Sequence, residues 1–248
     1  MDSFEKRKLI FWLIGGFLLL TAILISRTHF NSTAQVLGET TPAQKEVAVG
    51  NLPIIANAPL PERAYLNVLW ASQAPLGIWD DWHDETCEEG SVLLVHYYLT
   101  GQPLSSQQAE KELQDMVAFQ IANMGEQKNL TAQETIDWLI KKYYGHKKVR
   151  IVYDITLDDI KRELADGHPV IVPAAGRELK NPHFSGIGPL YHMFVIKGYE
   201  PGWFITNEIG TRVGKDYKYN PQIMYDAIHD WNGGDVANGR KVMIVIEK

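Results

Sequence analysis

The chain has 248 residues, of which 45% are hydrophobic and 22% are charged, a balance typical of a globular protein rather than a disordered or fibrous one. Its formal net charge of −6 disfavours nucleic acid as a partner, because phosphate binding needs a basic surface. Cys87 is the single cysteine. Internal disulfides and zinc knuckles built from paired cysteines are therefore excluded.

The first 27 residues have the features of a membrane segment. Three basic residues at positions 6–8 precede an uncharged run of 17 residues from Leu9 to Ile25, which is close to the shortest stretch that spans a bilayer. This arrangement is typical of a signal anchor or a cleaved signal peptide, and both place the following chain outside the cytoplasm. We favour the anchor, because the apolar run is longer than most signal-peptide cores. Without the four basic and two acidic residues of this segment, the 24 basic and 30 acidic residues of the chain leave a net charge of −8.

A polar linker is expected at residues 28–61, where Ser, Thr, Gln, Glu and Pro occur without a hydrophobic period. A folded domain at residues 62–248 is expected to follow. The first half of this domain predicts three helices. The first begins at Cys87 after a capping box of Thr86 and Glu89, the second spans residues 105–123, and the third spans residues 131–145 after a capping box of Thr131 and Glu134.

The second half of the domain predicts strands, because short runs rich in Val, Ile and aromatic residues alternate with turn residues. The strands are expected at residues 149–153, 169–173, 192–199, 203–207, 217–219 and 241–246, and helices at residues 157–165 and 221–229. Helices followed by strands favour an α+β fold, in which a helical half packs on an antiparallel sheet.

Cys87 has the local setting of a nucleophile. The unpaired N–H groups at a helix start favour the reactive thiolate over the thiol. Glu88 and Glu89 oppose this, because nearby negative charge raises the pKa of a thiol. Activation therefore needs a nearby imidazolium. The alternative is a buried and inert cysteine, since unpaired cysteines are often buried.

His192 and Asn207 lie on neighbouring predicted strands. His192 opens an apolar strand, and Asn207 ends the strand that follows it in a hairpin. Antiparallel pairing can bring the two side chains together, and an amide oxygen that accepts the imidazole N–H fixes the orientation and tautomer of the ring. His192 can then take the thiol proton and later protonate a leaving group.

These two segments resemble the C-terminal motifs of papain-like cysteine peptidases. Residues 192–199 read His-Met-Phe-Val-Ile-Lys-Gly-Tyr, and residues 207–214 read Asn-Glu-Ile-Gly-Thr-Arg-Val-Gly. In that family a histidine opens a strand ending in Gly-Tyr, and an asparagine opens an Asn-x-x-Gly-Thr segment. The chain is more closely similar to the bacteriocin-processing branch, the double-glycine-leader or C39-like peptidases, in which Gln-x-Pro and a tryptophan precede the cysteine. Residues 73–75 and Trp79 fit that pattern, and the resemblance covers about residues 65–246.

The resemblance implies a papain-like fold and a role for each matching residue. It implies that Cys87 is the nucleophile, His192 the general base and acid, and Asn207 the residue that orients the imidazole. It implies Gln73 as the side-chain donor of an oxyanion hole, with the backbone N–H of Cys87 as the second donor.

Two positions depart from the family pattern. Glu88 follows the cysteine, where the family usually has glycine, and Glu208 with Ile209 stands where many relatives have Asp-Pro. Glu208 is therefore an alternative orienting residue. Successive strand residues face opposite sides, so only one of Asn207 and Glu208 can reach His192, and the Gly-Thr spacing favours Asn207.

The implied function is that of a bacterial, membrane-tethered, extracytoplasmic cysteine peptidase-like hydrolase that forms a thioester acyl-enzyme and needs no cofactor or metal. The expected partners are a peptide or protein substrate and the cell membrane, and not nucleic acid. Leader processing is not expected, because the chain faces outward and has no transporter segment. Two alternatives stay open: a catalytically inactive peptide-binding domain of the same fold at the cell surface, and a transferase that uses the same acyl-enzyme.

Two surfaces near Cys87 have open interpretations. The glycine- and proline-rich residues 181–189 are expected to wall the substrate cleft, to close over it as a lid, or to be a static connector. The acidic side chains near the nucleophile are expected to form a solvated rim or to select basic substrates; they are Asp80, Asp81, Asp84, Glu85, Glu88 and Glu89.

Overall fold

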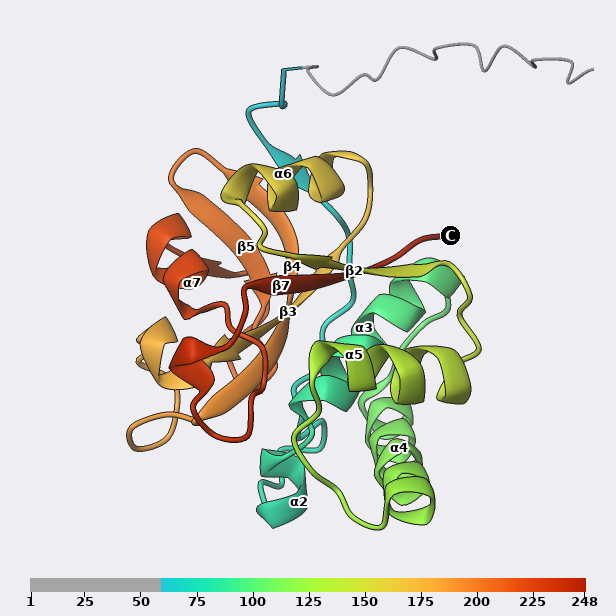
Figure 1. The fold of residues 1–248 in the computed structure, drawn as a ribbon. Helices are drawn as coiled ribbons and strands as arrows, with labels where there is room; N and C mark the ends of the chain where they lie inside the picture. The colour runs from blue at the N-terminus through green and yellow to red at the C-terminus, as the bar shows by residue number, and fades with distance from the viewer. Residues whose placement is uncertain (1–58) are drawn as a thin grey trace, which may run out of the picture. The chain divides into compact units, whose positions relative to one another are not determined.

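The computed structural model describes residues 59–248 and, apart from a two-residue strand at Ala64–Tyr65, has a helical first half followed by a strand-rich second half, as expected (Figure 1). The helical half contains α2 (Asp81–Asp84), α3 (Cys87–Thr100), α4 (Ser106–Met124) and α5 (Ala132–Glu134), and α5 continues in π-helical turns as η1 (Thr135–Tyr143). The helix at Cys87 begins where the sequence predicts it. The capping box of Thr131 and Glu134 is also formed as predicted.

Seven antiparallel strands form one sheet in the order β2, β7, β3, β4, β5, β6, with β1 paired to β4. The strands are β1 (Ala64–Tyr65), β2 (Val149–Tyr153), β3 (Val170–Ala175), β4 (Tyr191–Glu200), β5 (Trp203–Asn207), β6 (Tyr217–Tyr219) and β7 (Val242–Ile246). The remaining helical elements are α6 (Leu157–Ala165), η2 (Gly176–Leu179), α7 (Pro221–Ala227) and η3 (Val236–Asn238). Every predicted strand is present: β2, β5 and β6 have the predicted bounds, and the ends of β3, β4 and β7 differ by one or two residues at most.

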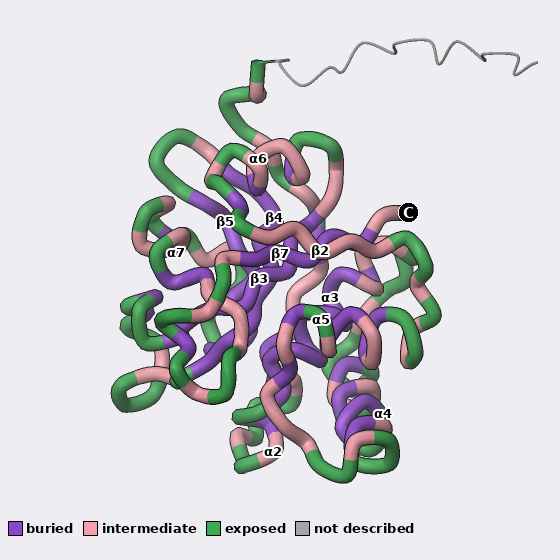
Figure 2. The backbone as a smooth tube through the Cα atoms, viewed as in Figure 1, coloured by how far each residue is buried: buried purple, intermediate pink, exposed green. Residues whose placement is uncertain are grey.

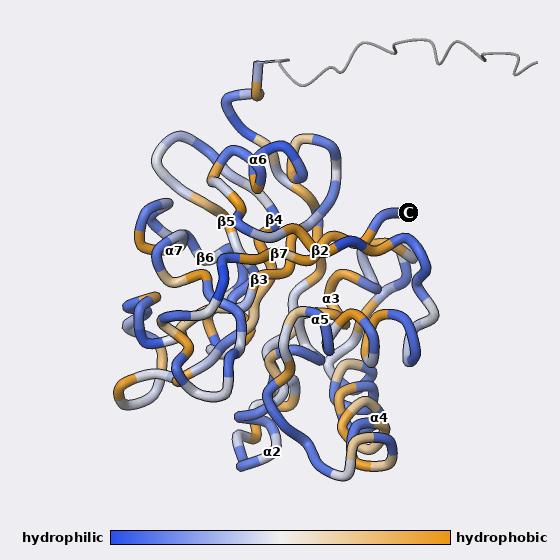
Figure 3. Tube along the Cα trace, in the orientation of Figure 1, coloured by the Kyte–Doolittle hydropathy of each residue, from blue (hydrophilic) through white to orange (hydrophobic). Residues whose placement is uncertain are grey.

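The two faces of the sheet bury different side chains. Met193 and Val195 of β4 pack with α3, α4 and η1 in one hydrophobic cluster, whereas Phe194 and Ile196 pack with α6 and α7 in another. Figure 2 shows that the central strands of the sheet are largely buried, and Figure 3 shows that hydrophobic residues concentrate in these strands. The alternation along β4 therefore sends neighbouring side chains to opposite cores.

Strands β4 and β5 pair through a β-bulge at Lys197. On the hairpin side of the bulge Gly198 lies opposite Ile205, but beyond it Val195 lies opposite Asn207. The pairing register thus changes by one residue. Because a shift of one residue turns each side chain to the other face, the bulge decides which residues at the end of β5 share a face with the start of β4.

The buried Lys197 side chain links this bulge to the segment that enters the domain. Its ammonium group donates to the backbone carbonyl of Val68 at 3.0 Å and forms an ion pair with Asp216 at 2.8 Å. With 1% of the residue exposed, this charge stays buried only because both partners are present.

The first turn of α3 buries two carboxyl groups. Glu88 and Glu89 are each 1% exposed, so the prediction of a solvated rim is wrong for this pair. Thr86 is the N-cap residue, but its hydroxyl donates to two backbone carbonyls and makes no capping bond, while Glu89 contacts Gln120 of α4. The predicted capping box of Thr86 and Glu89 is therefore absent, because tertiary partners engage both side chains.

Within residues 59–248, no helix is both long and apolar enough to cross a bilayer. The membrane segment predicted at residues 1–27, and most of the linker predicted at residues 28–61, lie outside the described residues.

We predict that Glu89→Gln makes the fold less sensitive to alkaline pH. Burial, followed by the charge of Glu88, raises the pKa of Glu89 well above its ordinary value of 4.5. The unfolded chain releases this proton at about pH 4.5 while the folded chain keeps it, so wild-type stability falls as the pH rises above that value, by about 1.4 kcal/mol per pH unit for one proton. Urea unfolding from pH 5 to 8 measures the difference. A stability gap between variant and wild type that stays constant over this range would contradict the prediction.

Candidate functional site

A pocket opens where the start of α3 meets the start of β4. Its volume is about 340 Å³, and its lining includes Gln73, Cys87 and His192. Cys87 is 4% exposed and His192 is 2% exposed, so both are buried in the protein but border the cavity. The structure thus brings three of the four predicted site residues to one place. The fourth, Asn207, is not part of the lining.

The Cys87 side chain is held as a thiol. Its sulfur donates to Glu88 Oε2 at 2.9 Å. Burial raises the pKa of the Cys87 thiol well above its ordinary value, the charges of Glu88 and Glu89 raise it further, and the backbone N–H of Met193 lowers it. The helix start alone therefore does not activate this cysteine. This agrees with the expectation that the two adjacent glutamates raise the pKa of the thiol.

The His192 imidazole is oriented by a buried carboxylate. Its Nε2 lies 2.5 Å from Glu208 Oε1, and Glu208 also accepts the hydroxyl of Tyr219 at 2.7 Å and the N–H of Gly210 at 3.0 Å. Burial opposes ionisation of Glu208, but the imidazole and these hydrogen bonds bring its pKa below the ordinary value. An ionised Glu208 places the imidazole proton on Nε2, which leaves Nδ1 as the nitrogen that can accept a proton.

The expected contact between Asn207 and His192 is wrong. The Asn207 amide donates to the backbone carbonyls of Val68 at 3.3 Å and Leu69 at 2.8 Å, on the opposite face of the sheet. The bulge in β4 is the physical reason. If pairing continued from the hairpin without it, Asn207 would lie opposite Ile196 and share a face with His192; with the bulge it lies opposite Val195, and Glu208 takes that place.

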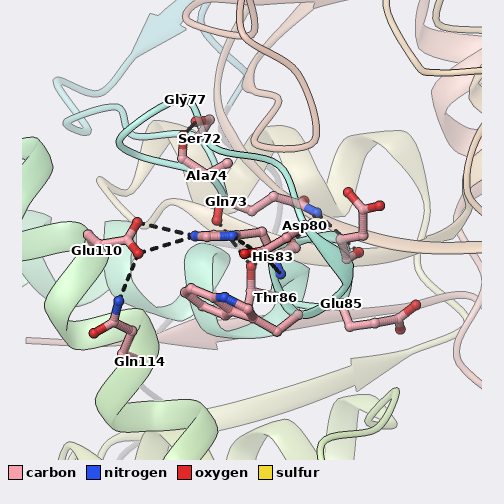
Figure 4. A network of polar contacts seen from close by, with 12 residues as sticks. Ser72, Gln73, Ala74, Gly77, Asp80, His83, Glu85, Thr86, Glu110 and Gln114 are labelled. Carbon is pink, nitrogen blue, oxygen red and sulfur yellow. Dashed lines mark hydrogen bonds and ion pairs between the residues drawn. The ribbon is translucent and has the colours of Figure 1, made fainter.

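Gln73 borders the pocket, but its amide group already has partners. Its Nε2 donates to the backbone carbonyls of His83 at 2.8 Å and Asp84 at 3.1 Å. Figure 4 shows His83 between two carboxylates: Nδ1 lies 2.6 Å from Asp80, and Nε2 lies 3.2 Å from Glu110. This network fixes the turn that precedes Cys87. The predicted role of Gln73 as an oxyanion donor requires its amide to release one of these carbonyls.

Several residues around the imidazole were not singled out from the sequence. The ring packs edge-on against Phe184, and a side chain at Gly210 would bring its Cβ to 2.9 Å from His192 Cε1. Glycine at this position therefore leaves room for the ring. The Asn-x-x-Gly spacing was the available signal for Gly210, whereas nothing local marks Tyr219 as a partner of Glu208.

Residues 181–189 form one wall of the pocket through Phe184, Ser185, Gly188 and Pro189. Of the three interpretations of this segment, the wall of the cleft is therefore the one that the structure supports. Closure of this loop as a lid stays a prediction.

Asp84 and Glu85 also border the cavity, so part of the expected acidic rim is present. In the part of the chain that the structure describes, no three His, Cys, Asp or Glu side chains gather as ligands of one metal ion.

Comparison with known proteins places the chain in a family. The sequence profile of the Peptidase_C39 like family matches residues 65–233, which confirms the resemblance seen in the sequence. A crystal structure of a Bacillus anthracis protein assigned to the C39-like peptidases is similar, with a TM-score of 0.50 and 15% identity over 76% of this chain and 99% of that chain. At this identity the likeness shows the fold alone. A search of curated proteins gave no match.

We predict that Glu208, and not Asn207, controls the reactivity of Cys87. Glu208→Ala removes the carboxylate that stabilises the imidazolium, and a hydrogen bond to a charged group contributes about 1.5 kcal/mol or more, so alkylation of Cys87 by iodoacetamide at neutral pH should slow by about tenfold or more. Glu208→Gln keeps a hydrogen-bond acceptor, so its alkylation rate should lie between the rates of Glu208→Ala and wild type.

Asn207→Ala is the matched control for this experiment. It removes only the bonds to Val68 and Leu69 and should lower the free energy of unfolding by about 1–3 kcal/mol, with alkylation close to the wild-type rate. If Asn207→Ala slowed alkylation as much as Glu208→Ala, the assignment of the orienting role would be overturned.

Proposed function

Because the chain belongs to the Peptidase_C39 like family, we propose that it is a cysteine hydrolase that cleaves a peptide or amide bond through a thioester on Cys87. One observation carries this proposal. The thiol of Cys87 and the imidazole of His192 border the same cavity. Glu208 contacts Nε2 of the ring, so Nδ1 is available for proton transfer.

The proposed reaction has two stages. His192 Nδ1 takes the thiol proton, and the sulfur attacks the substrate carbonyl to form a tetrahedral intermediate. The imidazolium then protonates the leaving amine as the C–N bond breaks, which gives the thioester and a neutral imidazole. In the second stage the imidazole takes a proton from water, hydroxide attacks the thioester, and the imidazolium returns the proton to the departing sulfur.

The oxyanion of each intermediate needs hydrogen-bond donors close to the sulfur. The backbone N–H of Cys87, at the first position of α3, is one candidate because the first N–H groups of a helix lack partners within the helix. Gln73 is the second, after its amide turns away from the carbonyl of Asp84. One such donor is typically worth about 3 kcal/mol of barrier height.

We also propose that the domain acts outside the cytoplasm on a peptide or protein of the cell envelope. The basic and apolar pattern of residues 1–27 supports an uncleaved signal anchor, and residues 28–61 have the composition of a linker between membrane and domain. The pocket lining contains Asp84 and Glu85 as carboxylates and no lysine or arginine, which favours a substrate with basic or neutral residues near the cleaved bond.

A second candidate function is peptide binding without catalysis. The observation that favours it is the bond from the Cys87 thiol to Glu88, because a carboxylate beside the sulfur stabilises the protonated and unreactive form. Turnover of peptide substrates separates the two functions. A pure binding domain would hold a peptide equally well as wild type and as Cys87→Ser, and neither protein would form an acyl-enzyme.

We predict that a peptide-based thiol probe labels the folded protein at Cys87 alone. His192→Ala should slow this labelling by about 100-fold, the lower range expected for loss of a general base, and Cys87→Ala should abolish it. Intact-protein mass spectrometry measures the extent of labelling, and unfolding in urea checks that each variant is folded. Labelling of wild type and His192→Ala at the same rate would contradict the proposed pairing.

A further inference from the structure

Glu88 is a buried carboxyl group in direct contact with the proposed nucleophile. Its Oε2 accepts the thiol of Cys87 at 2.9 Å, and its Oε1 accepts the backbone N–H of Leu130 at 2.7 Å. With 1% of the residue exposed, water does not compete for either oxygen. The two hydrogen bonds therefore hold the side chain beside the sulfur.

The groups packed around Glu88 are acidic or neutral. Glu89 follows it on α3, and Glu85 precedes the helix. From β4, Tyr191 directs its hydroxyl to the Leu130 carbonyl at 2.8 Å. The lysine of the adjoining loop, Lys128, pairs with Glu134 instead. Among residues 59–248, Glu88 forms no ion pair with a lysine, arginine or histidine, so proton uptake is the way in which its charge can be removed.

The charge on Glu88 changes what happens when Cys87 loses its proton. If Glu88 is ionised, transfer of the thiol proton to His192 creates two negative charges 2.9 Å apart in a buried site, which is strongly disfavoured. If Glu88 is protonated, the same transfer leaves one negative charge, and the carboxyl O–H turns to donate to the sulfur. The proton balance is the same in both cases, since the thiol proton moves to the imidazole.

We propose that Glu88 is a third catalytic group of this site: its protonated carboxyl donates a hydrogen bond to the Cys87 thiolate, and its ionisation as the pH rises switches the nucleophile off. The role of this thiolate in peptide cleavage rests on the proposed function above, whereas the coupling between the two side chains does not.

Glu88 changes its protonation state near neutral pH. Burial raises the pKa of Glu88 to about 7, although the hydrogen bonds from the thiol and from Leu130 lower it. Both charge states are therefore populated near neutral pH. Activity should be greatest below this value and decline above it, which is the reverse of a cysteine whose thiolate simply accumulates as the pH rises.

The test compares wild type with Glu88→Gln and Glu89→Gln. In Glu88→Gln the amide oxygen can still accept the Leu130 N–H and the amide N–H can donate to sulfur, so the variant imitates the protonated carboxyl at every pH. Alkylation of Cys87 by iodoacetamide at pH 8 should be about tenfold or more faster than in wild type, because a unit fall in thiol pKa raises the thiolate fraction tenfold. Glu89→Gln loses a buried carboxyl one residue away that contacts Gln120 and not the sulfur, and its effect should be much smaller.

The pH profile of peptide turnover gives a second readout. Wild-type turnover should decline from about pH 7 upward, and turnover by Glu88→Gln should keep its value over that range. If no substrate is cleaved but Glu88→Gln still accelerates alkylation, the proposed function fails while the coupling of the two side chains stands. Equal alkylation rates for wild type and Glu88→Gln, or a larger effect in Glu89→Gln, would overturn the proposal.

A measurement without a Glu88 variant covers the case in which Glu88→Gln does not fold. The carboxyl carbon of Glu88 can be titrated by NMR in wild type and in Cys87→Ala. The thiol hydrogen bond lowers the pKa of Glu88, so Cys87→Ala should move the titration midpoint to higher pH. An unchanged midpoint shows that the two groups are not coupled and contradicts the proposal.

Discussion

The site depends on how strand β4 divides its side chains between the two faces of the sheet. Met193 points to the core shared with α3, and its backbone N–H faces the Cys87 sulfur. His192, one residue earlier, points to the other face, where Phe194 and Glu208 hold the ring. The start of α3 on one face of the sheet and the His192 ring on the other can therefore border the same cavity at the end of β4. Any change that shifts β4 by one residue would exchange these two sets of side chains.

Most of the fold could be predicted from the sequence because its signals are local. The strands at residues 149–153, 203–207 and 217–219 and the helix at residues 157–165 occur with the predicted bounds. Each has a clear hydrophobic period between turn residues. The positions of Cys87 at a helix start and of His192 near the start of an apolar strand could also be predicted, since both are local patterns.

The errors arose where tertiary contacts compete with local preference. Thr86 and Glu89 have capping-box spacing, but the hydroxyl of Thr86 donates to two backbone carbonyls, and Glu89 contacts Gln120 of α4. The preference for Asn207 over Glu208 failed for a similar reason. A bulge at Lys197 leaves no mark in the hydrophobic pattern, yet it reverses the face of every residue paired beyond it. The lysine that holds the bulge depends on Val68 and Asp216, which are distant in sequence.

Glu208 and Glu88 are buried glutamates at the two ends of the proposed proton-transfer site, beside the imidazole and beside the thiol. Both are buried, but Glu208 faces an imidazole and two hydrogen-bond donors, which favour its ionised form. Glu88 has only a thiol and a single backbone N–H as donors, and although both lower its pKa, burial outweighs them and raises the pKa to about 7. An ionised group behind the imidazole stabilises the imidazolium, and a neutral group beside the sulfur tolerates the thiolate.

In the proposed reaction the two carboxyl groups therefore have to be in opposite charge states for the proton to pass from sulfur to nitrogen. With both ionised, the thiolate would face a carboxylate oxygen at 2.9 Å; with both protonated, the imidazolium would lose the partner that stabilises it. The pH range in which Glu208 is ionised and Glu88 is not lies between their two pKa values, which the surroundings shift in opposite directions. In this view the glutamate after the cysteine, which departs from the usual glycine of papain-like peptidases, does not disable the site but restricts it to conditions in which that glutamate keeps its proton.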